Sequence, residues 1–187
     1  MYRDSIQEIN ARRQKISTLR KEMREIQRDI KPEEVTDYVF GTISEPVRLS
    51  ELFGDKDTLF MIHNMGKSCP SCTQWADGFN GALDHLEDCA AFVVSSPDSP
   101  EEQRIFAKSR DWKFTMVSHA DTNFAQDMGY KSGGFWPGVS VFKMAGNKVV
   151  RVSDAMFGPG DDFNPIYNFL AMLPEGDGDW EPKYSYR

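Results

Sequence analysis

The stretch Thr58-Leu-Phe-Met-Ile-His63, followed after five residues by Cys69-Pro-Ser-Cys72, decides the fold of this chain. The first six residues form a nearly continuous apolar run, which predicts a strand buried on both faces of a sheet. Apolar side chains then recur at helical spacing over residues 73–87, which predicts a helix. The two cysteines therefore lie at the point where a buried strand leads into the first turn of a helix.

Further strands and helices follow in alternation. Ala91–Ser96 and Phe114–Ser118 are predicted strands. The helix between them, which we expect to end near Arg110, begins at Ser99-Pro-Glu-Glu102, where Ser caps the helix, Pro takes the first position and Glu completes a capping box. Strands that are joined by helices in this way pair in parallel within one sheet.

An antiparallel hairpin and two short helices complete the pattern. Val139–Lys143 and Lys148–Ser153 flank Gly146-Asn147, a pair of residues typical of hairpin turns. A short helix over Thr122–Met128 precedes the hairpin, and a last helix that opens at Asn164-Pro165 follows it. This order predicts an α/β fold with a mixed central sheet that helices cover on both faces.

The chain divides into three predicted parts. Residues 1–31 carry apolar side chains every seven residues, which predicts an amphipathic helix of about 25 residues stopped by Pro32. Residues 35–174 form the α/β domain, and residues 175–187 an extended tail. The helix either docks on its own domain or forms a homodimer contact with a second copy, and both alternatives stay open. The positions seven apart are Ile9, Ile16, Met23 and Ile30, with Leu19 and Ile26 between them.

Charge and composition exclude several classes of function. Residues 1–31 hold nine basic and five acidic residues, a charge of +4, whereas the rest holds 13 basic and 24 acidic residues, a charge of −11. The acidic body argues against a nucleic-acid partner, because phosphate contact requires a basic surface. No apolar run approaches the roughly 18 residues of a membrane span, and the start resembles no signal peptide. We therefore expect a cytoplasmic protein with neither a nucleic-acid nor a membrane partner.

The cysteine pair is the predicted centre of the chemistry. Three cysteines are too few for a disulfide-stapled scaffold, so a Cys-x-x-Cys pair in a reducing cytoplasm indicates catalysis or metal binding. The unpaired N–H groups and the dipole of a helix N-terminus stabilise a thiolate. Cys69 is therefore the predicted nucleophile and Cys72, one turn further in, the resolving thiol. Pro70 and Ser71, between them, are expected to face the substrate.

A zinc site is the alternative reading of the cysteines. The spacing Cys69-x2-Cys72-x12-His85-x3-Cys89 satisfies a zinc-finger pattern. A helix over residues 73–85 would, however, hold Cys72 and His85 about 20 Å apart, too far for ligands that must lie about 2.0–2.3 Å from one ion. We therefore expect no metal and no other cofactor, and Cys89 is interpreted as a small buried side chain.

Two other positions complete the predicted site. Trp136-Pro137-Gly138 directly precedes the first strand of the hairpin, where thioredoxin-fold proteins place a cis proline that faces the redox pair and binds substrate; the alternative is an ordinary trans turn. His63 stands six residues before Cys69, where thioredoxins have a buried acid that helps to deprotonate the resolving thiol. A histidine can fill that role near neutral pH, or it can be a core residue bonded to a backbone carbonyl.

Two signatures run through the chain. The first joins His63-Asn-Met65 and Cys69-Pro-Ser-Cys72 to Trp75-Ala-Asp-Gly-Phe-Asn80, and the second is Pro137-Gly-Val-Ser-Val-Phe142. Together they resemble an uncharacterised bacterial thioredoxin-like family, over about Val35–Leu173. The resemblance implies a thioredoxin-like fold and a dithiol–disulfide oxidoreductase that acts on a disulfide-containing substrate and is recycled by an unidentified reductant. Members usually have a longer loop before the first cysteine, whereas this chain has the short spacing of thioredoxins.

Two other functions remain open. A peroxiredoxin-like thiol peroxidase is the first, although peroxiredoxins carry a threonine three residues before the reactive cysteine and Gly66 stands in that position here. The hydroxyl that orients peroxide is therefore missing. The second is a non-catalytic thioredoxin-fold interaction protein that assembles through the N-terminal helix.

Overall fold

The structure is a computed structural model that describes residues 1–186, and it separates the chain into two units, Met1–Pro32 and a second that begins at Glu33. The first unit is one helix, α1 (Tyr2–Arg28). The helix predicted from the seven-residue spacing is thereby confirmed, and it ends before Pro32, which cannot continue a helix. Whether α1 docks on its own chain or on a second copy stays a prediction.

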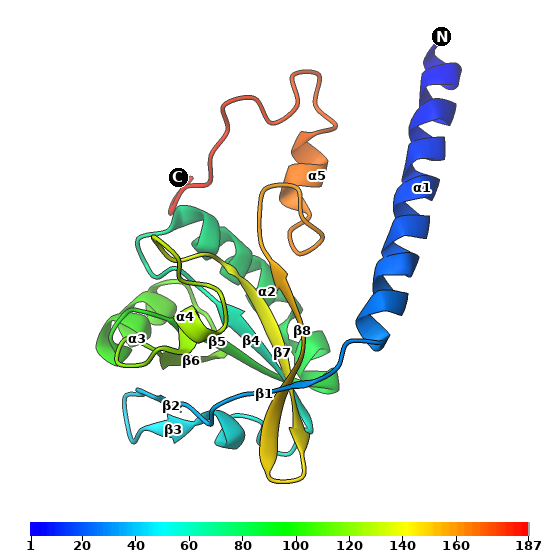
Figure 1. Cartoon of the computed structure of the whole chain (residues 1–187). Helices are drawn as coiled ribbons and strands as arrows, with labels where there is room; N and C mark the ends of the chain where they lie inside the picture. The colour runs from blue at the N-terminus through cyan, green and yellow to red at the C-terminus, as the bar shows by residue number, and fades with distance from the viewer. Residues whose placement is uncertain (187) are drawn as a thin grey trace. The chain divides into compact units, whose positions relative to one another are not determined.

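A six-stranded mixed sheet in the order β1-β8-β7-β4-β5-β6 forms the framework of the second unit (Figure 1). Strands β4, β5 and β6 run parallel, while β7 pairs antiparallel with β4 and with β8, and β1 adds a short antiparallel edge. The predicted mixed sheet and its hairpin are confirmed. The strands are β1 (Glu33–Glu34), β4 (Thr58–His63), β5 (Ala91–Ser96), β6 (Thr115–Ser118), β7 (Gly138–Ala145) and β8 (Lys148–Met156).

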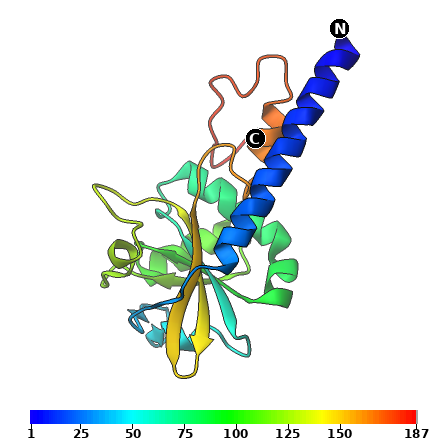
Figure 2. The same cartoon turned by 45° about the vertical axis from the view of Figure 1, so that its right-hand side comes forward.

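Helices α2 (Pro70–Cys89) and α3 (Pro100–Ser109) connect the parallel strands and pack on one face of the sheet (Figures 1 and 2). The other face is covered by α4 (Phe124–Asp127), the one-turn helix η1 (Leu49–Glu51), and a small sheet of β2 (Val39–Phe40) and β3 (Val47–Arg48). A last helix, α5 (Ile166–Leu170), follows the hairpin.

Strand β4 explains why its sequence is apolar without alternation. Leu59 and Met61 belong to the core under α4, whereas Ile62 belongs to the core under α2. Because successive side chains of a strand point to opposite faces, a central strand covered on both faces needs apolar residues at almost every position. By the same alternation, His63 continues the row of Leu59 and Met61 and points to the face of α4.

The predicted start of α3 is confirmed. The Ser99 hydroxyl accepts a hydrogen bond from the N–H of Glu102 (3.3 Å), and the Glu102 carboxylate accepts one from the N–H of Ser99 (3.0 Å), so both halves of the capping box form. Gly146 in the β7–β8 turn has a φ of 65°, which glycine adopts without steric cost.

The C-terminal segment differs from the extended tail that the sequence predicts. Residues 171–179 form successive turns, and residues 180–186 follow without regular structure; position 187 of the predicted tail lies outside the described residues. Figure 1 shows this segment returning to the N-terminal end of α2. Across residues 1–186, no helix combines the length and the apolar character needed to cross a membrane.

Candidate redox site

Cys69 is the N-cap residue of α2, as the sequence predicts. Its backbone is extended, with φ −102° and ψ 104°, and Pro70 takes the first helical position, where a missing N–H costs nothing. The N–H of Cys72 donates to the Cys69 sulfur (3.0 Å), and the Thr73 hydroxyl donates to the Cys69 carbonyl (3.0 Å). A thiol thus fills the capping role that a hydroxyl or a carboxylate usually fills.

The two sulfurs of the pair lie 2.7 Å apart. Both thiols are free; Cys69 is half-buried, whereas Cys72 is only 3% exposed. A disulfide bond is about 2.05 Å long, so a small movement within one helical turn is enough to close it. The pair therefore has one sulfur within reach of a substrate and one that is shielded behind it.

The pKa values of the two thiols move in opposite directions. The pKa of Cys69 is lowered to about 7, chiefly because its thiolate accepts a hydrogen bond from the Cys72 thiol, with further help from the N–H groups of Cys72 and Ser71 against the effect of burial. The pKa of Cys72 is raised by that same hydrogen bond, by burial and by the negative charge on Cys69. Cys69 therefore has a larger thiolate fraction at neutral pH than an ordinary cysteine.

Pro137 lies beside the pair, and Trp136 projects toward solvent. Pro137 and Cys72 line one cavity of about 10 Å³, which is room for about one water molecule. Trp136 is 51% exposed. The described residues contain no cis peptide bond, so the expectation of a cis Pro137 is wrong. Two backbone hydrogen bonds, from Trp136 N–H to the Tyr130 carbonyl and from Phe157 N–H to the Pro137 carbonyl, hold the trans segment.

His63 lines the same cavity, but its ring makes its contacts on the other face of the sheet. The imidazole stacks on Tyr130 at 3.8 Å between ring centres, and its Nε2 lies 2.9 Å from the Ser140 hydroxyl. Nδ1 has no hydrogen-bond partner among the described residues. Burial, with smaller effects from His119 and Arg151, lowers the pKa of His63 well below 6.5. The histidine is therefore neutral at physiological pH.

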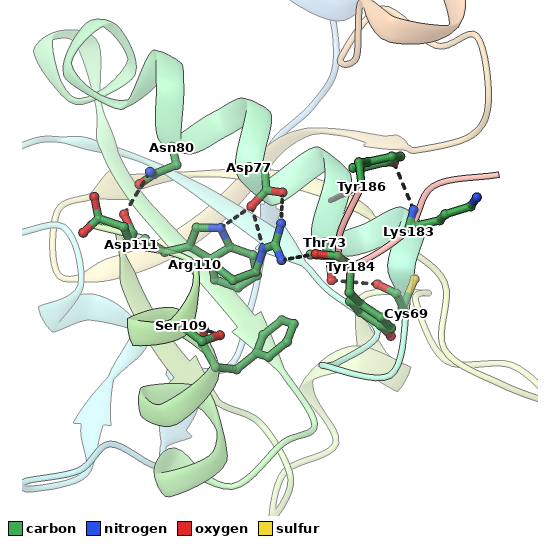
Figure 3. A network of polar contacts seen from close by, with 12 residues as sticks. Cys69, Thr73, Asp77, Asn80, Ser109, Arg110, Asp111, Lys183, Tyr184 and Tyr186 are labelled. Carbon is green, nitrogen blue, oxygen red and sulfur yellow. Dashed lines mark hydrogen bonds and ion pairs between the residues drawn. The ribbon is translucent and has the colours of Figure 1, made fainter. Parts of the chain in front are cut away.

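Side chains of α2 that sequence analysis did not assign to the site organise its surroundings (Figure 3). Asp77 pairs with Arg110 and accepts a hydrogen bond from the Trp112 indole (2.8 Å). Asn80, one turn further, bonds the carbonyl of Asp111 and the N–H of Lys113. Both residues lie in the Trp75–Asn80 signature, so the polar residues of this signature hydrogen-bond α2 to the loop that leads into β6.

Tyr184 of the C-terminal segment also reaches the site. Its hydroxyl donates to the Lys67 carbonyl (3.0 Å), two residues before Cys69. Arg110 donates to the Tyr184 carbonyl (2.9 Å). Sequence analysis missed this contact, because a backbone acceptor 74 residues away from its donor leaves no pattern to find.

Cys89 does not belong to the site. It is exposed, which corrects the expectation of a buried side chain; the thiol stands at the last residue of α2, where the helix leaves the core. Because α2 runs without a break from Pro70 to Cys89, Cys72 and His85 lie about 20 Å apart. No group of three or more metal-ligating side chains comes together within residues 1–186.

A family described as "Bacterial protein of unknown function (DUF899)" matches residues 2–186. No curated protein matches the chain. Among solved structures, peroxidoxin BcpB from Mycobacterium tuberculosis is similar with a TM-score of 0.59 and 20% identity, covering 74% of this chain and 91% of that one.

Two more solved structures have the same fold. Reduced Prx3 from Vibrio vulnificus is similar with a TM-score of 0.58 and 13% identity over 71% of this chain and 89% of its own. Peroxiredoxin Q from Xanthomonas campestris gives 0.56 and 18% over 64% and 80%. These likenesses confirm the predicted thioredoxin-like α/β fold.

Proposed function

The chain belongs to the bacterial family DUF899, and for this member we propose the activity of a dithiol–disulfide oxidoreductase. Cys69 is the nucleophile and Cys72 the resolving thiol. The observation that carries the proposal is the pair itself: two sulfurs 2.7 Å apart at the first turn of α2, one half-buried with a lowered pKa and one buried with a raised pKa. That asymmetry is what an attacking and a resolving thiol require.

The first step is attack by the Cys69 thiolate on a substrate disulfide. A bond forms between Cys69 and one substrate sulfur, the substrate S–S bond breaks, and the departing sulfur leaves as a thiolate that takes a proton from water. Cys72 then attacks Cys69, forms the intramolecular disulfide and releases the second substrate sulfur. The substrate gains two electrons and the protein loses two, so an external reductant must return them.

The resolving step requires a more acidic Cys72. In the mixed disulfide, Cys69 has no negative charge and accepts no strong hydrogen bond, so two of the causes that raise the Cys72 pKa disappear. In this proposal the proton passes toward His63 through a water in the cavity that both residues line, because the His63 ring makes its own contacts on the other face of the sheet. Because burial keeps the pKa of His63 low, the histidine holds that proton only briefly and passes it on.

The remaining predicted site residues are proposed to contact the substrate. Pro70 and Ser71 lie between the two cysteines in the first turn, Pro137 lies by Cys72, and Trp136 offers an exposed ring for an apolar substrate. The proposed partners are a disulfide-containing substrate and a cellular reductant. In a reducing cytoplasm, the proposed compartment, the pair would act as a reductant.

Disulfide turnover with matched cysteine variants tests the proposal. We expect the wild type to reduce insulin or glutathione disulfide, Cys69→Ser to abolish turnover, and Cys72→Ser to accumulate a mixed disulfide that mass spectrometry detects. Cys89→Ser is the control, since that exposed thiol stands about 28 Å along α2 from the pair and should leave turnover unchanged. Full activity of Cys69→Ser would contradict the nucleophile assignment.

A thiol peroxidase is the second candidate, supported by the likeness of fold to the peroxiredoxins and by the lowered pKa of Cys69. The groups near Cys69 give it less support. Gly66 has no side chain, and the Lys67 ammonium is paired with Glu102 at 2.7 Å. The rate of hydrogen peroxide consumption, measured beside disulfide reduction in the same preparation, decides between the two. A protein inactive in both assays would point to the interaction role instead.

A further inference from the structure

The C-terminal segment Pro182–Tyr186 is held against the first turn of α2 (Figure 3). Pro182 is buried although the residues on both sides of it are exposed. Tyr184 is bonded twice: its carbonyl accepts from Arg110 Nη1 (2.9 Å), and its hydroxyl donates to the Lys67 carbonyl (3.0 Å). The segment is thereby fixed through both its backbone and a side chain.

The anchor of this segment is itself fixed. Asp77 accepts from Arg110 Nε (2.9 Å) and Nη2, a two-pronged pairing, and also from the Trp112 indole. The Arg110 side chain is four-fifths buried. Because a bidentate carboxylate determines the orientation of the guanidinium plane, the remaining nitrogen Nη1 presents its donor at one place, which the Tyr184 carbonyl occupies.

The side chain of Tyr184 reaches the segment that leads into Cys69 (Figure 3). Its hydroxyl bonds Lys67, two residues before Cys69, and its ring meets Phe106 edge-on at 6.2 Å between ring centres. Burial raises the pKa of Tyr184, and the negative charge of the Cys69 thiolate raises it further.

From this placement we propose that Tyr184 is a specificity-determining residue, whose ring forms one wall of the entrance to Cys69 and limits it to small disulfides and extended, flexible segments. Asp77 and Arg110 are positioning residues that act through it. The inference rests on the proposed function, because it names the substrate class of that same site. Behind the pair, the cavity at Cys72 holds only about 10 Å³, so a bulky group finds no room there either.

Two thiol reagents that share a reactive group but differ in size test whether the Tyr184 ring restricts access to Cys69. In Cys89→Ser protein, Cys69 is the thiol that reacts, because Cys72 is buried with a raised pKa. We compare the rates of N-ethylmaleimide and of a maleimide carrying a polyethylene glycol chain. Tyr184→Ala should raise the rate of the large reagent about tenfold or more and leave that of the small one within about twofold.

Two further variants separate the ring from its anchors. Tyr184→Phe keeps the ring, so the ratio of the two rates should stay near that of the parent protein. Arg110→Gln removes the donor to the Tyr184 carbonyl and should give an intermediate ratio. Equal acceleration of both reagents in Tyr184→Ala would overturn the proposal, as would no change in either.

The native protein provides an internal reference if Tyr184→Ala fails to fold. In Cys69→Ser protein the exposed Cys89 reacts instead, and its preference for the small reagent is that of an open thiol. The preference at Cys69 should exceed that at Cys89 and should vanish in urea. If the native protein prefers the small reagent no more strongly at Cys69 than at Cys89, Tyr184 does not restrict access to Cys69.

Turnover then distinguishes this inference from the proposed function. The alkylation ratio needs no catalysis, so a protein that shows the size filter but reduces no disulfide contradicts the proposed function alone. The kcat/KM of insulin relative to hydroxyethyl disulfide should rise in Tyr184→Ala. If the enzyme is active but Tyr184→Ala leaves the ratio of the two kcat/KM values unchanged, only the specificity role of Tyr184 is contradicted.

Discussion

Two thiols three residues apart differ in acidity because the helix start treats them differently. Cys69 caps α2 and collects the N–H groups of its first turn, together with the thiol of Cys72. Cys72 lies one turn in and is only 3% exposed, and the hydrogen bond that stabilises the Cys69 thiolate, together with the charge on that thiolate, makes its own ionisation harder. One hydrogen bond between the sulfurs therefore assigns both roles at once.

Alkylation of Cys69 should follow this acidity. In Cys89→Ser protein we expect the rate with iodoacetamide to rise with pH around a midpoint of about 7, rather than near the ordinary value of 9.0. Cys72→Ala removes the main donor to the thiolate and should move the midpoint upward. A midpoint that is the same in both proteins would show that the backbone alone sets the acidity.

His119 makes stability depend on pH. It is 3% exposed, and burial, helped by Lys131, lowers its pKa from 6.5 to about 4. Between these values the unfolded chain binds a proton that the folded protein excludes, so stability falls as the pH drops from about 6.5 to about 4, by up to about 3 kcal/mol. His119→Phe, which suits the neighbouring rings of Phe124 and Phe135, should remove this part of the pH dependence in urea unfolding. An identical pH dependence in both proteins would contradict the assignment.

At the scale of elements, α2 organises the site along its length. Its first turn holds the thiols, and its second and third turns hold the loop before β6 through Asp77 and Asn80. Its apolar face packs on β4 and β5. The same helix thus positions the chemistry and the surface around it.

Loss of the Asp77 carboxylate should destabilise this arrangement. Asp77→Ala leaves the nearly buried Trp112 indole N–H without its acceptor, which costs about 1–3 kcal/mol. Asp77→Asn keeps an oxygen for the indole and should cost less. Urea unfolding of the two variants measures the difference, and equal losses would mean that the pairing with Arg110 dominates.

Gly138 at the start of β7 has no room for a side chain. A Cβ there would overlap the Tyr130 ring and lie 2.5 Å from the Ala155 carbonyl oxygen on β8. Gly138→Ala should therefore cost about 1–3 kcal/mol by overpacking. Gly81→Ala, in open space on α2, is the matched control and should stabilise the protein by up to about 1 kcal/mol. An unfolding midpoint unchanged in Gly138→Ala would show that the hairpin yields at this point.

At the scale of the whole molecule, the features that can be predicted from the sequence are those that a few neighbouring residues determine. The apolar runs of β4 and β5, the Gly146-Asn147 turn and the capping box each act over a few residues, and all are confirmed. The placement of the cysteine pair follows from them. Contacts between distant segments could not be predicted, since the hydrogen bond from Arg110 to the Tyr184 carbonyl joins residues far apart in the chain and has no local signature.

The seven-residue pattern of α1 supports one prediction about assembly. A single helix cannot bury its own apolar stripe, and a repeat of seven suits a second helix of the same kind. If copies pair through α1, sedimentation should give twice the chain mass of 21.3 kDa, and Ile16→Glu with Met23→Glu should halve it. A mass of one chain for the unaltered protein would exclude the homodimer.

The course of the C-terminal segment has a practical consequence. Tyr186 follows Tyr184 by two residues, a span of at most about 7 Å, so a dye joined at position 186 begins close to the residue that bonds the Lys67 carbonyl, two residues before Cys69. A fluorophore attached there should change its emission when the thiols are oxidised, which would make the protein its own optical reporter. For the same reason, a bulky group attached at position 186 would hinder access to Cys69.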